Sequence, residues 1–346
     1  MTNTKKLAFA SDYQQGAHPE ILKRLSEINL APHAGYGTDE ISALAREKIR
    51  AACAAPEADV FFLAGGTQTN ALIIGACLQS YQGVLAAETG HVSLHEAGAV
   101  ELGGHKVMTL PQQEGKLSAE TIRGAFRTFA EDENRDHMVM PGMVYLSQPT
   151  EYGTLYNLKE LEEISKVTHA AGALLYVDGA RLAYALGCPA NDVTLADLAR
   201  LCDAFYIGGT KCGALFGEAV VFPKKDTVPH FFTIVKQHGA LLAKGFVTGL
   251  QFDVLFTDGL YESCGRHAIV IADRIRDALS EKGYRFAIDS PTNQMFLLLD
   301  REQEARLTEK IEMSFWERPD EDHVIMRIAT CWATIEEEAD ALIALL

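Results

Sequence analysis

The chain has 346 residues, of which 48% are hydrophobic and 23% charged, and its formal net charge is −16. This length supports a large core and two domains, and the composition is typical of a folded protein. The negative charge disfavours nucleic acid and anionic membranes as partners, and no apolar run approaches the roughly 18 residues of a membrane span. The N-terminus has no apolar signal segment, so we expect no signal peptide. Seven scattered cysteines without a C-x-x-C pair favour a reducing, cytoplasmic environment.

Hydrophobic periodicity predicts strands that alternate with helices over most of the chain. A helix is expected over 19–29, opened by Pro19, and Thr38 is expected to cap the next. The predicted strands are short apolar runs at 60–63, 84–88, 106–110, 138–147, 174–178, 204–208 and 218–223. The helices expected between them begin after Gly65 and cover 118–130 and 158–171. The strand at 138–147 is expected to be interrupted around Pro141 and Gly142.

The pattern changes towards the C-terminus. An apolar segment over 230–256 is interrupted at Gly239, Gly245 and Gly249. Beyond it we expect a helix over 261–282, strands at 295–300 and 323–330, and a closing helix from residue 335. Such a mixture predicts a small α+β domain. We therefore divide the chain into a large domain, 1–258, with an N-terminal arm, and a small domain, 259–346.

Three side chains with complementary chemistry follow two of the buried strands. The first strand ends in Asp178, followed closely by Arg181, and the second ends in a glycine turn that leads to Lys211. Ligands of open α/β sheets lie at the carboxyl ends of the strands, so we expect one crevice to hold all three. A lysine that forms a Schiff base and an acid that pairs with the pyridinium nitrogen are the groups that pyridoxal 5′-phosphate requires. Either residue alone is more often a helix cap or a surface residue, and it is the combination that predicts this cofactor.

A glycine turn at 65–67 predicts the phosphate site. Backbone amides and the positive end of the following helix favour an anion there, so we expect Gly66 and Thr67 to bind phosphate, with the Thr210 hydroxyl as an addition. The turn matches neither a Walker A loop nor the G-x-G-x-x-G fingerprint, which disfavours nucleotide cofactors.

Two further features have ambiguous chemistry. His91 and His95 are one helical turn apart, but H-E-x-x-H order and a third ligand are missing, so we expect no metal site. Arg327 lies within an apolar strand, where an unpaired charge is unfavourable. It therefore needs either a buried partner or a carboxylate ligand, which its planar fork can bind through two hydrogen bonds.

These residues resemble the threonine aldolase group of fold-type I pyridoxal phosphate enzymes, within the β-eliminating lyase superfamily. The matching residues occur in the family's order over nearly the whole chain: Ser11-Asp12, Tyr36-Gly37, Gly66 to Asn70, His91, Glu96-Ala97-Gly98, Asp178 to Arg181, Thr210-Lys211, Arg327 and Trp332. The resemblance implies an α/β fold with a seven-stranded, mostly parallel sheet in the large domain and a small α+β C-terminal domain.

The resemblance also implies roles for several residues. His91 would stack on the cofactor ring, and Tyr36 and Lys244 would reach the cofactor phosphate of a neighbouring subunit, so a homo-oligomer, dimer or tetramer, with shared active sites is expected. Ser11, Arg181 and Arg327 would bind the substrate carboxylate, and Arg181 would also contact the cofactor.

One position departs from the family. Relatives carry a histidine two residues before Gly153, where this chain has Glu151. The base that takes the hydroxyl proton is therefore either His91 or Glu151.

The resemblance implies retro-aldol cleavage of L-threonine or L-allo-threonine to glycine and an aldehyde. An aminotransferase or a β-eliminating lyase would share the cofactor residues and remains the alternative. A nicotinamide dehydrogenase would need the dinucleotide fingerprint, and a non-catalytic member would be expected to lack Lys211 or Asp178.

Overall fold

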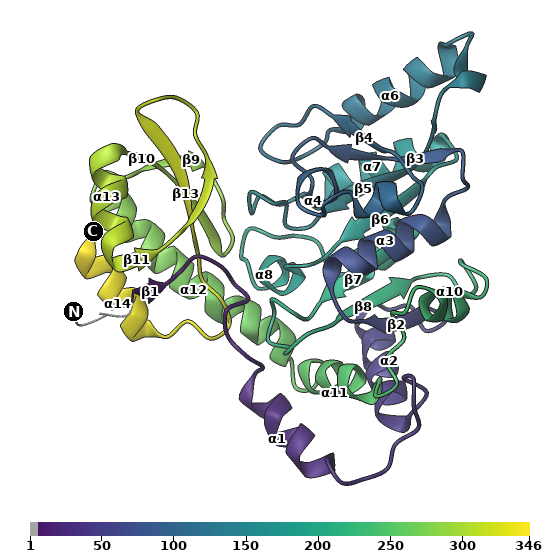
Figure 1. Cartoon of the computed structure of the whole chain (residues 1–346), viewed down its shortest axis with the longest axis horizontal. Coiled ribbons are helices and arrows are strands. Elements are labelled where there is room, and N and C mark those ends of the chain that lie inside the picture. The colour runs from purple at the N-terminus through teal and green to yellow at the C-terminus, as the bar shows by residue number, and fades with distance from the viewer. Residues whose placement is uncertain (1–5) are drawn as a thin grey trace.

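The computed structural model describes residues 6–346 of the chain. Figure 1 shows a larger layered body around one sheet and a smaller body that holds the C-terminus. Helix α12 (Leu260–Glu281) runs between them and is the longest helix of the described residues. Among residues 6–346, no helix is both long and apolar enough to cross a membrane.

The larger body is organised by a seven-stranded sheet with the order β2-β8-β7-β6-β5-β3-β4. Its strands are β2 (Asp59–Leu63), β3 (Gln82–Ala87), β4 (Val107–Leu110), β5 (Met140–Ser147), β6 (Leu174–Asp178), β7 (Ala204–Gly208) and β8 (Glu218–Phe222). Neighbouring strands from β7 to β4 are parallel, whereas β8 is antiparallel to both β7 and β2. The predicted seven-stranded, mostly parallel sheet is confirmed.

The central strands are almost continuously apolar because both faces of the sheet are covered. In β7, Phe205 and Ile207 pack into one core, while Ala204 and Tyr206 pack into a second core on the opposite face. This alternation follows from the two-residue period of a strand, and burial on both sides explains the absence of polar alternation.

Helices on both faces supply the rest of these cores. The helices of the larger body are α1 (Pro19–Ile28), α2 (Glu40–Ala52), α3 (Gly66–Cys77), α4 (His91–Leu94), α5 (Ala99–Leu102), α6 (Ala119–Glu131), α7 (Leu158–Ala170), α8 (Leu182–Leu186), α9 (Leu195–Leu201), α10 (Phe231–Gln237) and α11 (Phe246–Leu255), with a 3-10 turn at Arg135–His137. The predicted alternation of strands and helices is therefore present.

Two local predictions were wrong and one was partly right. Asp39, not Thr38, caps α2, because its carboxylate accepts hydrogen bonds from both the amide and the hydroxyl of Ser42, each at 2.8 Å. Gly249 lies inside α11 and does not interrupt the helix. A glycine is needed there because a side chain would collide with Ser42 of α2. Strand β5 continues past residues 141–142, where only Gly142 is left out of the pairing with β3.

The smaller body has a four-stranded antiparallel sheet with the order β12-β13-β10-β9. Its elements are β9 (Arg285–Ile288), β10 (Gln294–Asp300), α13 (Arg301–Lys310), β11 (Ile311–Glu312), β12 (Ser314–Glu317), β13 (His323–Ala329) and α14 (Glu336–Leu345). Strand β1 (Leu7–Ala8) pairs in parallel with β11, and Phe9 is buried in the core of this body. The α+β character is as predicted. The boundary at residues 258 and 259 stays a prediction, and β1 ties the N-terminal arm to the smaller body.

Helix α12 approaches the larger body through a backbone contact. A side chain at Gly265 of α12 would collide with the carbonyl of Ala183 in α8, and one at Gly187 would collide with the backbone of α12 at Arg266. Because backbone atoms line the contact, rotation of a flexible side chain cannot relieve the clash. This contact holds α8, which begins directly after Arg181.

Substituting Gly265 by alanine is therefore expected to destabilise the protein by about 1–3 kcal/mol, the range of overpacking in a well-packed core. Urea unfolding checks this. The matched control is Gly124→Ala in α6, where an added Cβ meets nothing within 4 Å. That variant is expected to gain about 0.5–1 kcal/mol from helix propensity. Equal unfolding midpoints for Gly265→Ala and the native chain would contradict the rigid contact.

Candidate active site

Polar side chains gather at the carboxyl edge of the larger sheet, as the strand pattern predicts. A cavity of about 340 Å³ lies there, and its walls include Gly66, Thr67, His91, Asp178, Lys211 and Glu218. A second cavity of about 730 Å³ shares His91, Glu151, Arg181 and Lys211 with the first and extends to Trp316 and Arg327. The two cavities together bring most of the predicted site residues into one place.

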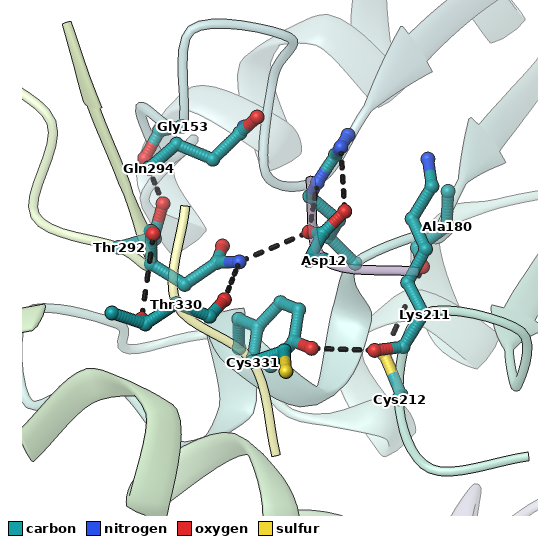
Figure 2. A network of polar contacts seen from close by, with 12 residues as sticks. Asp12, Gly153, Ala180, Lys211, Cys212, Thr292, Gln294, Thr330 and Cys331 are labelled. Carbon is teal, nitrogen blue, oxygen red and sulfur yellow. Dashed lines mark hydrogen bonds and ion pairs between the residues drawn. The ribbon is translucent and has the colours of Figure 1, made fainter. Parts of the chain in front are cut away.

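Lys211 presents its amine to both cavities. Its Nζ atom makes no hydrogen bond or ion pair with any of residues 6–346, and Figure 2 shows the labelled side chain ending without a contact. Burial, with a further contribution from the charge of Arg181, lowers the pKa of the amine. Tyr184 fixes the backbone by donating its hydroxyl hydrogen to the Lys211 carbonyl. An unpaired amine with a lowered pKa is suited to attack on a carbonyl carbon.

Asp178 is surrounded by hydrogen-bond donors. Its Oδ2 atom accepts from the Tyr145 hydroxyl at 2.7 Å and from Asn70 Nδ2 at 3.0 Å, and its Oδ1 atom accepts from the Ala180 amide at 2.9 Å. Burial would raise the pKa of this carboxyl, but the nearby His91 and the hydrogen bonds outweigh burial and lower the pKa. Asp178 is therefore an ionised carboxylate held in a fixed orientation.

A chain of hydrogen bonds links Asp178 to His91. Asn70 Nδ2 donates to Glu96 Oε1 at 2.6 Å as well as to Asp178, and the Tyr176 hydroxyl donates to Asn70 Oδ1 at 2.6 Å. Glu96 Oε1 in turn lies 2.7 Å from His91 Nδ1. With Nδ1 occupied by a carboxylate, Nε2 is the ring nitrogen of His91 left for another partner.

Glu151 lines both cavities together with His91. Its Oε1 atom accepts from the backbone amide of His91 at 2.9 Å and from the Ser147 hydroxyl at 2.6 Å. Burial raises the pKa of this carboxyl above its ordinary value. The structure therefore places both candidate bases, His91 and Glu151, beside Lys211.

Arg181 lies in both cavities but is already paired. Its Nε atom donates to Asp12 Oδ2 at 2.6 Å, and a terminal nitrogen donates to Asp12 Oδ1 at 3.0 Å. Asn293 also donates to Asp12 at 3.0 Å, in the network of Figure 2. Burial opposes ionisation of Asp12, yet Arg181 and Lys211 bring its pKa to about 2. A carboxylate role for Arg181 stays a prediction, as it does for Ser11, whose buried hydroxyl has no partner among residues 6–346.

The hydrogen-bond partners of Arg327 among residues 6–346 are all neutral. Its terminal nitrogens donate to Gln294 Oε1 at 3.0 Å, to the Ala10 carbonyl at 2.9 Å and to the Ser314 hydroxyl at 3.2 Å. Its Nε atom is buried without an acceptor among residues 6–346, and the guanidinium lies 5.4 Å from the centre of the Trp316 ring. Burial lowers the pKa to about 10, so the group stays charged at neutral pH. Of the two possibilities raised by the sequence, this geometry favours a carboxylate ligand.

The predicted phosphate site lies at the start of α3. Within residues 6–346, the amides of Gly66 and Thr67 have no acceptor, and Gly65, the residue before the helix, has no capping side chain. The Thr210 hydroxyl is already in use, because it donates to Glu218 Oε1 at 2.7 Å and accepts from the Gly217 amide at 3.0 Å. Binding of phosphate by Gly66 and Thr67, and by Thr210 in addition, stays a prediction.

Tyr36 and Lys244 are not brought to this site within the chain. The Tyr36 amide donates to the Ala243 carbonyl at 3.0 Å, so the two residues lie on neighbouring loops. Tyr36 is 42% exposed, with Lys236 Nζ 4.3 Å above its ring, and Lys244 is exposed. Their predicted role at a neighbouring subunit's cofactor stays a prediction.

Several residues of the site were not singled out from the sequence. Tyr145 and Tyr176 face each other on paired strands, and they belong to the same core as Tyr206. The sequence does contain a signal for these residues, because the tyrosines stand at equivalent positions of successive apolar strands. Glu218, a carboxylate that begins an apolar strand, carried a similar signal.

Comparison with known proteins agrees with this geometry. A family model described as beta-eliminating lyase matches residues 8–313. A low specificity L-threonine aldolase from Pseudomonas aeruginosa is 36% identical over 242 residues, which cover 68% of this chain and 67% of that protein. A second one, from a Pseudomonas species, is 32% identical over 296 residues, covering 84% of this chain and 83% of the relative.

The solved structure of a Leishmania major threonine aldolase has the same fold. It superposes with a TM-score of 0.94 at 42% sequence identity, and the match covers 98% of both chains. The resemblance inferred from individual motifs is thereby confirmed over the whole chain. The chain belongs to the beta-eliminating lyase family, in which it is similar to the threonine aldolases.

Proposed function

We propose that this chain is a pyridoxal 5′-phosphate-dependent aldolase that cleaves L-threonine or L-allo-threonine to glycine and acetaldehyde. One observation carries the proposal: the unpaired amine of Lys211 and the ionised, fully hydrogen-bonded carboxylate of Asp178 line the same cavity. The similarity to proteins named as threonine aldolases supports the substrate.

The residues present fit the cofactor. Lys211 would hold its aldehyde carbon, Asp178 its ring nitrogen, and the unpaired amides of Gly66 and Thr67 its phosphate, with His91 against the ring. When bound, pyridoxal phosphate supplies an electron sink for the bonds of the amino-acid α-carbon. The donors that hold Asp178 ionised maintain the carboxylate that the ring nitrogen requires.

Arg327 would orient the substrate through its carboxylate. Its guanidinium is charged, its partners are neutral, and it lies on the wall of the larger cavity that Lys211 also lines. Fixing the carboxylate at that wall would determine which bond of the α-carbon is aligned with the electron sink that the cofactor supplies. Arg181 would act as a second cation near the substrate, its orientation set by Asp12.

His91 would take the proton of the substrate β-hydroxyl at its Nε2 atom. Glu96 occupies the other ring nitrogen, as the acid does in catalytic histidine–carboxylate pairs. Glu151 is the second choice, because its Oε1 atom is already occupied by two hydrogen bonds.

The assembly and the compartment belong to the same proposal. The exposed neighbours Tyr36 and Lys244 support a homo-oligomer in which each subunit completes the phosphate site of another. All seven cysteines of the chain are free, which supports the reducing cytoplasm as its compartment.

The central test is covalent attachment together with product analysis. Borohydride reduction of the yellow, cofactor-loaded protein is expected to fix the cofactor on Lys211, and Lys211→Ala is expected to lose both the label and activity. With threonine, glycine and acetaldehyde should form in equal amounts, with little pyruvate from serine. Faster transfer of the amino group from alanine to a keto acid would overturn the aldolase proposal.

Substituting Arg327 by glutamine is expected to raise KM for threonine. Loss of a charge-assisted hydrogen bond of about 1.5–3 kcal/mol corresponds to a roughly 10- to 150-fold fall in kcat/KM. Steady-state kinetics of aldehyde release provide the measurement. Arg274→Gln is the control, since Arg274 is exposed and paired with Asp340 on the surface. An unchanged KM in the Arg327 variant would remove this residue from the substrate site.

Shared active sites predict complementation between inactive chains. A Lys211→Ala chain lacks the covalent group, and a Tyr36→Ala chain lacks the proposed contact with its neighbour's phosphate. Mixed oligomers of the two are expected to regain part of the activity, because one of their sites contains both intact residues. Activity from a monomer at assay concentration, measured with light scattering, would contradict sharing.

A further inference from the structure

Glu218 is a buried carboxyl in the active-site cavity to which the proposed reaction assigns no role. It is 3% exposed and begins β8, where it pairs with Leu63, the last residue of β2, and with Gly208, the last residue of β7. Because β8 is antiparallel to both neighbours, its first residue lies at the edge where they end. Glu218 therefore stands between the turn that opens α3 and the turn that carries Lys211.

Its contacts are all with neutral donors. Glu218 Oε2 accepts from the Gly209 amide at 2.9 Å, and Oε1 accepts from the Thr210 hydroxyl at 2.7 Å. Within residues 6–346 no lysine, arginine or histidine forms an ion pair with it. The carboxyl lines the smaller cavity together with Gly66 and Thr67, whose amides are unpaired.

A carboxylate at this position conflicts with a phosphate at the start of α3. Neighbouring strands lie about 4.8 Å apart, so Glu218 is one strand away from the end of β2. Like charges at this range repel strongly where water is excluded. A protonated carboxyl removes the repulsion and gains a hydrogen that it can donate to an anion.

We propose that Glu218 takes up a proton when a doubly charged anion binds at the start of α3. The proton comes from solvent and converts the carboxylate to the neutral acid, and no other bond changes. The inference rests on the proposed function, in which this anion is the phosphate of the cofactor. It makes Glu218 a positioning residue that fixes the lysine turn and adjusts its own charge to the anion.

The surroundings of Glu218 allow this protonation near neutral pH. Burial raises the pKa of Glu218 to about 7, although the bonds from Thr210 and Gly209 lower it. The other titratable or charged groups around it are Lys211, Asp178, Tyr176, Tyr206, Tyr261 and Cys212. Burial first, and nearby carboxylates as well, raise the pKa values of the tyrosines and the cysteine, so these groups stay neutral, and Asp178 stays ionised. Among these groups, Lys211, with its lowered pKa, is the other one whose charge can change as the pH rises. Glu151 lines the same cavity and also has a raised pKa, so it is tested separately.

The test therefore uses the ligand-free Lys211→Ala chain, which removes that second group and any covalent chemistry. Sulfate is the probe, because it keeps its double charge at both pH values. Calorimetric titration at matched ionic strength, at about pH 6 and about pH 8.5, measures its affinity. We expect weaker binding at the higher pH, by up to ~10-fold for each unit above the Glu218 pKa. Adding Glu218→Gln to the Lys211→Ala chain should abolish this difference in sulfate affinity. Adding Glu151→Gln instead should leave the difference unchanged.

Proton uptake is measured on the Lys211→Ala chain alone, so the conclusion does not depend on folding of the double variant. At about pH 8, the binding heat should differ between two buffers of unlike ionisation enthalpy by the amount for uptake of one proton. An unaltered pH dependence of sulfate binding after Glu218→Gln is added overturns the proposal. Sulfate binding that does not depend on pH would also overturn the proposal, and so would the absence of sulfate binding.

The two proposals fail independently. If borohydride fixes no cofactor on Lys211 of the unaltered chain while sulfate binding is coupled to Glu218, the proposed function falls and the anion site remains. If the cofactor is fixed on Lys211 but sulfate binding is independent of Glu218, the proposed function remains and the proposal for Glu218 falls.

Discussion

The site depends on one constraint, a carboxylate that is buried without a contacting cation among the described residues. Removing Asp178 from water is unfavourable by several kcal/mol unless donors replace the lost solvent. Those donors come from three different elements: Tyr145 on β5, Asn70 on α3 and the amide of Ala180 directly after β6. The central position of β6, with β5 beside it and α3 on one face, is therefore a condition for keeping this carboxylate ionised.

The other buried acids of the two cavities also depend on hydrogen-bond donors or on an ion pair. Asp12 is paired directly with Arg181, whereas Glu151 and Glu218 are held by neutral donors and have raised pKa values. Arg327 shows the opposite case, a buried cation with neutral partners. The charge of Arg327 is thus left unbalanced, which suits an anionic group at that end of a ligand.

Local sequence signals predicted the strands, their glycine-bounded ends and the placement of Asp178 and Lys211 in one crevice. This worked because a parallel strand buried on both faces gives a continuous apolar run, and its carboxyl end is a ligand site in this architecture. The signals could not predict the pairing of Asp12 with Arg181, because those residues are 169 positions apart and meet only after the N-terminal arm joins the smaller body. Periodicity does not resolve which of Thr38 and Asp39 caps α2; in the structure the Thr38 hydroxyl donates to the Gly35 carbonyl, and the Asp39 carboxylate accepts from the Ser42 amide.

The reversed strand β8 explains why the two ends of the cavity are so far apart. Without it, β2 and β7 would be neighbours, and the start of α3 would lie one strand from the lysine turn. Inserting β8 separates them by two strand spacings, about 10 Å, and places the first residue of β8 in the gap. A residue at that position contacts the lysine turn and lines the same cavity as the start of α3. An apolar side chain there would leave the Thr210 hydroxyl without its acceptor, and a permanently charged acid would repel an anion at α3. A carboxyl that can change its protonation meets both requirements.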